Sequence, residues 1–61
     1  MSKYAIVDNQ SDYIWGIFDD PKSAQETIKE QNTPSFYRIE EIADVSKYIV
    51  DGKIIKQHYE G

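Results

Sequence analysis

The feature that most constrains this chain is the run of aromatic and β-branched residues at 13–18, which is followed directly by Asp19, Asp20 and Pro21. Such residues are enriched in β-strands, so the run predicts a strand. Asp is favoured as a helix N-cap because it accepts a free backbone N–H, and Pro is favoured at the first helical position because it has no N–H to satisfy. The sequence therefore predicts a strand over 13–18 and a helix from Pro21 to about Gln31.

A second strand is predicted over residues 3–8, joined to the first by the polar turn at 9–12. The length of this loop decides which side chains share a face. With a loop of two or four residues, one face carries Ala5, Val7, Ile14, Gly16 and Phe18, and the opposite face carries Tyr4, Ile6, Tyr13, Trp15 and Ile17. A three-residue loop exchanges the partners. In the first arrangement Gly16 leaves room for a helix to approach the smaller face.

The predicted helix has a narrow apolar stripe, formed by Ala24 and Ile28. Such a stripe can cover one face of a small sheet but not both. Asn32 suits the left-handed position after the helix, and Pro34 prevents the helix from continuing.

Two further segments complete the predicted fold. Residues 35–42 alternate well enough to form a strand, and a right-handed crossover places it antiparallel beside the strand over 3–8. Asp51-Gly52 between β-branched runs predicts a hairpin in which Val50 faces Lys53. The expected fold class is α+β, a single small domain over residues 1–61. Its mainly antiparallel sheet has four or five strands, in the order ββαβββ, with one helix packed on one face.

Composition limits the possible partners. The net charge is −4, which disfavours binding to a phosphate backbone, and no stretch has the roughly 20 apolar residues that a membrane span requires. The chain contains no cysteine, so disulfides and thiolate metal sites are excluded, and it opens with no basic region followed by an apolar one. We expect a cytoplasmic protein that binds no membrane and for which nucleic acid is a poor partner.

No pattern in the sequence predicts catalysis, a metal site or a cofactor. Asp8, Asn9 and Asp12 lack the glycine and the distal Glu of a calcium loop, and ordinary turn chemistry accounts for them. Asp19 and Asp20 are accounted for by the helix cap. The one histidine, at position 58, has no cysteine, serine or second histidine beside it in the sequence. The sequence predicts neither an enzyme nor a cofactor.

A locally basic patch lies near the end of the chain, with two tyrosines among its cations. Single-stranded nucleic acid is bound by such combinations of cations and aromatic rings. Asp51 and Glu60 lie in the same stretch and weaken this interpretation. The residues concerned are Lys47, Tyr48, Lys53, Lys56, His58 and Tyr59.

The aromatic face of the sheet is the candidate interaction site, because one thin helix leaves it uncovered. Trp and Tyr dominate binding hot spots, so this face predicts a protein-binding module whose partner is another protein or a second copy of the chain. In the alternative, the sheet curls and these side chains pack on each other and on the C-terminal hairpin. The candidate binding residues are Tyr4, Ile6, Tyr13, Trp15, Ile17 and Phe36.

The order of hairpin, Asp-Pro-capped helix and strand over residues 4–42 resembles that of very small phage and prophage accessory proteins. The residues that carry the resemblance are Tyr4 to Asp8, Trp15 to Pro21, Ala24, Ile28 and Tyr37 to Ile42. The resemblance implies a stoichiometric binder, an inhibitor or modulator of a host or defence-system protein. Two other functions stay open: a self-associating structural homodimer, and a weak acidic DNA mimic.

Overall fold

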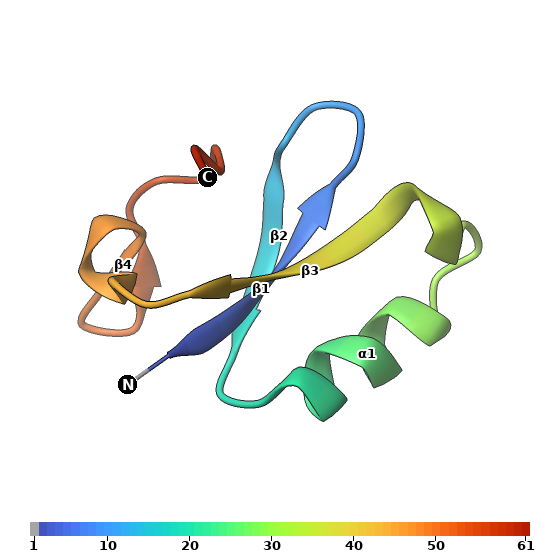
Figure 1. Cartoon of the computed structure of the whole chain (residues 1–61), viewed down its shortest axis with the longest axis horizontal. Coiled ribbons are helices and arrows are strands. Elements are labelled where there is room, and N and C mark those ends of the chain that lie inside the picture. Colours follow the sequence, from blue (N-terminus) through green and yellow to red (C-terminus); the bar gives the residue numbers. More distant parts are fainter. Residues whose placement is uncertain (1) are drawn as a thin grey trace.

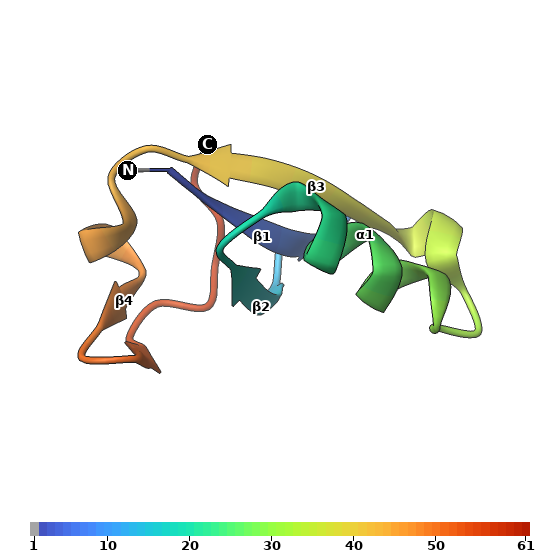
Figure 2. The ribbon, with the colours of Figure 1, turned by 90° about the horizontal axis from the view of Figure 1, so that it is seen from below.

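The computed structural model describes residues 2–61 and has an α+β fold with one α-helix and antiparallel sheets. A three-stranded sheet in the order β2-β1-β3 lies between α1 and a separate two-stranded sheet, β4-β5 (Figures 1 and 2). The elements are β1 (Lys3–Asp8), β2 (Ile14–Phe18), α1 (Pro21–Lys29), η1 (Pro34–Phe36), β3 (Tyr37–Ile42), η2 (Val45–Lys47), β4 (Ile49–Val50) and β5 (Lys53–Ile54). The predicted single sheet of four or five strands is therefore wrong, because the η2 turn directs the chain away from the sheet after β3.

The first hairpin has the four-residue loop that was one of the predicted options. The backbone N–H of Asp8 donates to the carbonyl of Tyr13 at 2.9 Å, which closes the loop. Inside the loop, the Asp8 carboxylate accepts from the backbone N–H of Gln10 at 2.8 Å, and Asp12 adopts a φ of 58°. Asp and Asn tolerate this left-handed conformation better than most residues.

A β-bulge at Trp15 changes the pairing of β2 with β1. Val7 pairs with Ile14, but its neighbour Ile6 pairs with Gly16, so Trp15 is an extra residue in the ladder. Beyond the bulge the faces differ from the prediction: Gly16 and Phe18 lie on the face of Ile6, and Ile17 lies on the opposite face. The predicted division of β2 is thus correct up to Trp15 and wrong after it.

Gly16 has a different role from the predicted one. A Cβ at this position would lie 3.1 Å from Cε1 of Phe18, which is tighter than ordinary van der Waals contact. The missing side chain therefore accommodates the Phe18 ring, not the backbone of a closely approaching helix.

The start of α1 is as predicted. Asp20 is the N-cap, and its carboxylate accepts from the backbone N–H of Ser23 at 2.8 Å and from the Ser23 hydroxyl at 3.1 Å. These hydrogen bonds favour the ionised form and lower the pKa of Asp20. The helix ends at Lys29, two residues before the predicted Gln31, and Asn32 does not adopt the left-handed conformation predicted for it.

Each face of the sheet has its own hydrophobic cluster. On one face, Ala24 and Ile28 of α1 pack on Ile6, so the helix covers the face of Ile6 and not the predicted face of Ala5 and Val7. The other face is covered by the chain after β3. Its buried residues are Ala5, Val7, Ile14, Ile42 and Tyr48, with Ile17, Val45 and Tyr59 packed against them.

The C-terminal part of the chain forms the predicted hairpin and then returns to β2. Val50 pairs with Lys53 across Asp51 and Gly52, whose φ angles of 53° and 76° suit a tight two-residue turn. Further on, His58 forms a bridge with Tyr13 at the edge of β2. No helix within residues 2–61 has the length and apolar character needed to cross a membrane.

Candidate functional site

Trp15 is the exposed aromatic residue that borders an apolar hollow. Its side chain is 59% exposed, and the other strongly exposed aromatic residue, Phe36, is 57% exposed. Phe36 lies beside polar residues of the first loop, including Asn9 and Gln10. Trp15 lies next to apolar and aromatic side chains, so the two exposed rings have different surroundings.

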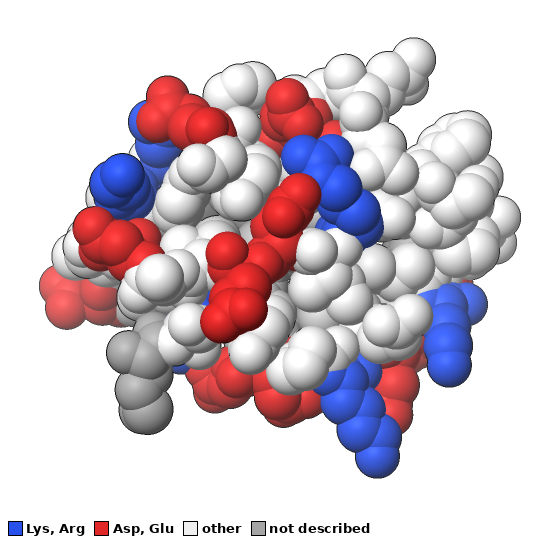
Figure 3. Space-filling view, viewed as in Figure 1, with Lys and Arg blue, Asp and Glu red and all other residues white. Residues whose placement is uncertain are grey.

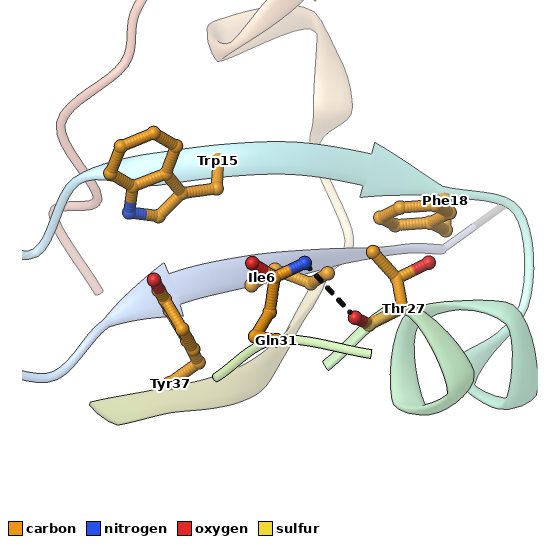
Figure 4. A pocket seen from close by; sticks show the side chains of 6 residues that line it. All are labelled: Ile6, Trp15, Phe18, Thr27, Gln31 and Tyr37. Atoms are coloured by element: carbon orange, nitrogen blue, oxygen red, sulfur yellow. Dashed lines mark hydrogen bonds between the residues drawn. The ribbon is translucent and has the colours of Figure 1, made fainter. Parts of the chain in front are cut away.

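The hollow lies between α1 and the sheet and has a volume of about 360 Å³ (Figure 4). All three strands and the helix contribute to its lining. Ile6 of the central strand is buried, and the other lining residues surround it. The lining residues are Ile6, Trp15, Phe18, Thr27, Gln31 and Tyr37.

Three aromatic rings support one another at one end of the hollow. The rings of Trp15 and Tyr37 have centroids 6.5 Å apart and an interplanar angle of 88°. Tyr13 packs edge-on against Trp15, with centroids 4.7 Å apart and an angle of 61°. Such edge-to-face pairs are favourable because the positive edge of one ring meets the negative face of another. We call Tyr13, Trp15 and Tyr37 the aromatic corner.

The register of the sheet explains why these residues meet. Asp8 of β1 pairs with Tyr37 on one side, and its backbone N–H binds the carbonyl of Tyr13 on the other. Tyr13, Asp8 and Tyr37 therefore form one row across the sheet, on the face of Ile6. α1 packs on the next rows, at Ile6 and Ile39, and leaves the aromatic corner at its C-terminal end.

The helix and the residues directly after it each contribute one polar side chain to the hollow. The hydroxyl of Thr27 donates to the carbonyl of Ser23 at 2.9 Å, so it is bound back to the helix. The Nε2 atom of Gln31 donates to the carbonyl of Thr27 at 3.3 Å. Figure 4 shows that this leaves the side-chain oxygen of Gln31 directed toward Trp15 and Tyr37.

The six predicted binding residues do not form one face. Tyr13 and Trp15 lie in the aromatic corner, with Ile6 buried beside them and Tyr4 half-buried on the same face, opposite Phe18. Ile17 packs against the cluster on the other face of the sheet. Phe36 lies apart from the hollow, in η1.

Four lining residues were missed by the reasoning from sequence. Tyr37 lies within the strand predicted over 35–42, but nothing in the sequence paired it with Trp15. Phe18 was placed on the other face, because the bulge was not foreseen. Thr27 and Gln31 flank the predicted helix stripe, and this position was the available signal for both of them.

Arg38 is the centre of a second polar cluster, on the other face of the sheet. Its guanidinium donates to Glu40 at 2.6 Å, to Asp12 at 3.0 Å and to Asn9 at 3.1 Å, and it lies 5.8 Å from the centre of the Tyr59 ring. The hydrogen bond to Glu40, followed by that to Asp12, raises the pKa of Arg38. The cluster ties the first loop, β3 and the C-terminal segment together.

Several other residues that were considered for chemistry form structural contacts. The carboxylates of Asp8 and Asp12 bind loop N–H groups and Arg38 respectively, and Lys56 of the basic patch pairs with Glu60 at 2.6 Å. This pair lowers the pKa of Glu60. Within residues 2–61, no three His, Asp or Glu side chains are grouped so that they could hold a metal ion.

Charge is unevenly spread over the surface. Figure 3 shows carboxylates gathered over the middle of β3, with a basic side chain beside them, while the end of the molecule near the first loop and η1 is largely uncharged on this side.

The chain was compared with protein-family models, with curated proteins and with solved structures, and it matches none of them. The proposal for the function therefore rests on the geometry of the site.

Proposed function

We propose that the chain is a small cytoplasmic protein-binding module that contacts its partner through the aromatic corner and the hollow beside it. The observation that carries the proposal is the position of Trp15, which is 59% exposed and held against Tyr13 and Tyr37 at the edge of an apolar hollow. Covering a large, exposed apolar ring with a partner surface is favourable, because it removes apolar surface from water.

The rigidity of the corner supports this proposal. Ordering a flexible side chain at an interface costs about 0.5–1.5 kcal/mol. Trp15 is already braced at 4.7 Å by Tyr13, and its backbone is fixed in the ladder on both sides of the bulge. A pre-ordered tryptophan loses less conformational freedom on binding, which is typical of residues that dominate binding energies.

The chemistry of the hollow supports a binding role and not a catalytic one. Its six lining residues include no carboxylate, imidazole or thiol, the groups that most often act as general bases or nucleophiles. A stoichiometric binder, such as the inhibitor or modulator of a host protein that the resemblance to phage accessory proteins implies, needs only a stable complementary surface.

The test is a capture experiment with matched variants. Wild type, Trp15→Ala and Phe36→Ala are immobilised and exposed to lysate of the source organism. The retained protein is identified by mass spectrometry, purified and titrated by calorimetry. We expect Trp15→Ala to weaken binding roughly 10- to 100-fold. Phe36→Ala, which removes an equally exposed ring outside the corner, should change the affinity by less than about twofold.

Two results would replace this proposal with one of the alternatives. If the only retained protein is the chain itself, and sedimentation shows a dimer, the function is self-association. If Trp15→Ala binds as tightly as wild type while charge reversal at Glu40 and Glu41 abolishes binding, the acidic surface is the contact and the DNA-mimic interpretation is favoured.

A further inference from the structure

α1 and its C-cap carry exposed side chains of both charges. Thr27 and Gln31 line the hollow, and Glu30, three residues after Thr27, is its neighbour on the helix surface. Glu26 precedes Glu30 by four residues. Both glutamates are exposed, and neither forms an ion pair within residues 2–61. Lys29 instead lines a separate groove between α1 and β3. One carboxylate, that of Glu30, therefore lies beside a residue that lines the hollow.

The interior of the hollow is suited to a cation as well as to an apolar group. The rings of Trp15 and Tyr37 stand at 88° to each other, and the faces of aromatic rings attract cations. The oxygen of Gln31, directed toward both rings, is a hydrogen-bond acceptor (Figure 4). Its orientation is set because the nitrogen of the same amide already donates to the carbonyl of Thr27.

We infer that the hollow binds the side chain of an arginine from a basic segment of the partner protein. The inference rests on the proposed function and names the residue that the partner inserts. The planar guanidinium stacks on Trp15 or Tyr37 and donates from its edge to the Gln31 oxygen, which the compact ammonium of lysine does less well. The methylene stem packs against Ile6 and Phe18, as the stems of long cations do on apolar surfaces.

The charge of the whole chain favours the same partner. The net charge is −4, and complementary charge speeds the encounter with a basic segment. Glu30, beside Thr27 on the helix surface, places part of that negative charge next to the hollow, where it acts on neighbouring cations of the segment as well as on the inserted arginine.

The test uses Trp15 as the reporter, because it is the only tryptophan of the chain. The full chain is titrated with three blocked tripeptides, Gly-Arg-Gly, Gly-citrulline-Gly and Gly-Leu-Gly, and the emission of Trp15 is followed. Citrulline keeps the shape of arginine and removes its charge. We expect a saturable change with the arginine peptide at an affinity about tenfold higher than with either control, and weaker binding as salt is added.

Two variants examine the role assigned to Gln31. Gln31→Met removes the acceptor oxygen at similar size, and Lys29→Met removes a charge from the last residue of α1, which lines the separate groove between α1 and β3. We expect Gln31→Met to lower the affinity for the arginine peptide about threefold or more and to leave the affinity for the leucine peptide unchanged. Lys29→Met should change the affinity for either peptide by less than about twofold. Far-ultraviolet circular dichroism of each variant establishes that the helix is retained.

The outcomes separate this inference from the proposed function. Equal binding of the arginine, citrulline and leucine peptides, or stronger binding of the leucine peptide, overturns the inference and leaves the proposed protein-binding site in place. No saturable change with the arginine peptide also overturns the inference. If, in addition, Trp15→Ala leaves capture of the protein partner intact, the proposed function is wrong as well.

Discussion

The rings of Trp15 and Tyr37 meet at 6.5 Å although their strands, β2 and β3, are not neighbours in the sheet. The central strand β1 lies between them, and both side chains line a hollow that the buried Ile6 of β1 also lines. The bulge at Trp15 places Phe18 on this same face, where a regular ladder with Val7 opposite Ile14 would place it on the other. One extra residue therefore determines which side chains enclose the hollow.

Deletion of Trp15 should convert β2 into a regular strand. Val7 would still pair with Ile14 and Ile6 with Gly16, now without an extra residue between them. We expect the shortened chain to fold with a free energy of unfolding within about 1 kcal/mol of wild type, since Trp15 is largely exposed. Urea denaturation measures the free energy, and amide spectra report whether the ladder is retained.

The matched control for this deletion is removal of Ile17. That deletion moves Phe18 to the opposite face, so it should destabilise the protein much more than deletion of Trp15. If the two deletions cost the same, the position of the bulge is wrong.

Gly16→Ala tests the contact between Gly16 and Phe18. The new Cβ would lie 3.1 Å from the Phe18 ring. The ring must therefore shift from its place against the cluster of Ile6, Ala24 and Ile28. We expect a loss of about 1 kcal/mol in the free energy of unfolding. In a Phe18→Leu background the same substitution should cost clearly less, because the two residues are coupled. Additive effects in the double-mutant cycle would contradict the contact.

Local signals in the sequence were sufficient for several elements. Asp20 and Pro21 predicted the start of α1, because capping depends on neighbouring backbone groups alone. Asp51-Gly52 predicted the second hairpin for a similar reason: both residues tolerate the positive φ that its turn requires. The pairing of β3 with β1 followed from the handedness of the connection.

The faces of β2 and the covering of the sheet could not be predicted in this way. Trp15 and Gly16 are compatible with either a regular strand or a bulge, so the alternating pattern did not reveal the extra residue. The burial of Tyr48 depends on the η2 turn, which carries the chain across the face of Ala5 and Val7. The aromatic corner arises from both effects, and the sequence identified Trp15 without identifying Tyr37.

Arg38 is expected to contribute more to stability than the other ion pairs of the surface. It binds Glu40, Asp12 and Asn9 at once with a planar guanidinium, which lysine cannot imitate. Arg38→Lys should lower the free energy of unfolding by about 1–2 kcal/mol. Lys3→Met, which breaks the exposed pair with Asp19, should cost less than about 0.5 kcal/mol. Equal costs in urea denaturation would show that the Arg38 cluster is not a structural centre.

Tyr59 should make stability depend on pH in the alkaline range. Burial, with a smaller contribution from the nearby Glu40 carboxylate, raises the pKa of Tyr59 above its ordinary value of 10.0. The folded state therefore holds this proton more tightly than the unfolded state. The resulting stability is fully present below pH 10 and is lost as the pH rises through the folded pKa.

Tyr59→Phe removes this ionisation. Urea denaturation from neutral pH to above pH 10 should show a shallower alkaline loss for the variant than for wild type. Parallel curves for the two proteins would mean that Tyr59 titrates alike in the folded and unfolded states, contrary to its burial and to the nearby Glu40 carboxylate.

Collisional quenching of Trp15 by acrylamide, in the free protein and in the complex with its captured partner, tests the central claim most directly. Because the chain contains a single tryptophan, with an exposed fraction of 59%, the free protein should be quenched nearly as readily as the unfolded chain. A partner without tryptophan, or one in which tryptophan has been replaced, keeps the signal specific. The account predicts that quenching falls sharply in the complex. A Trp15 already shielded in the free protein, or one quenched equally in both states, would contradict it.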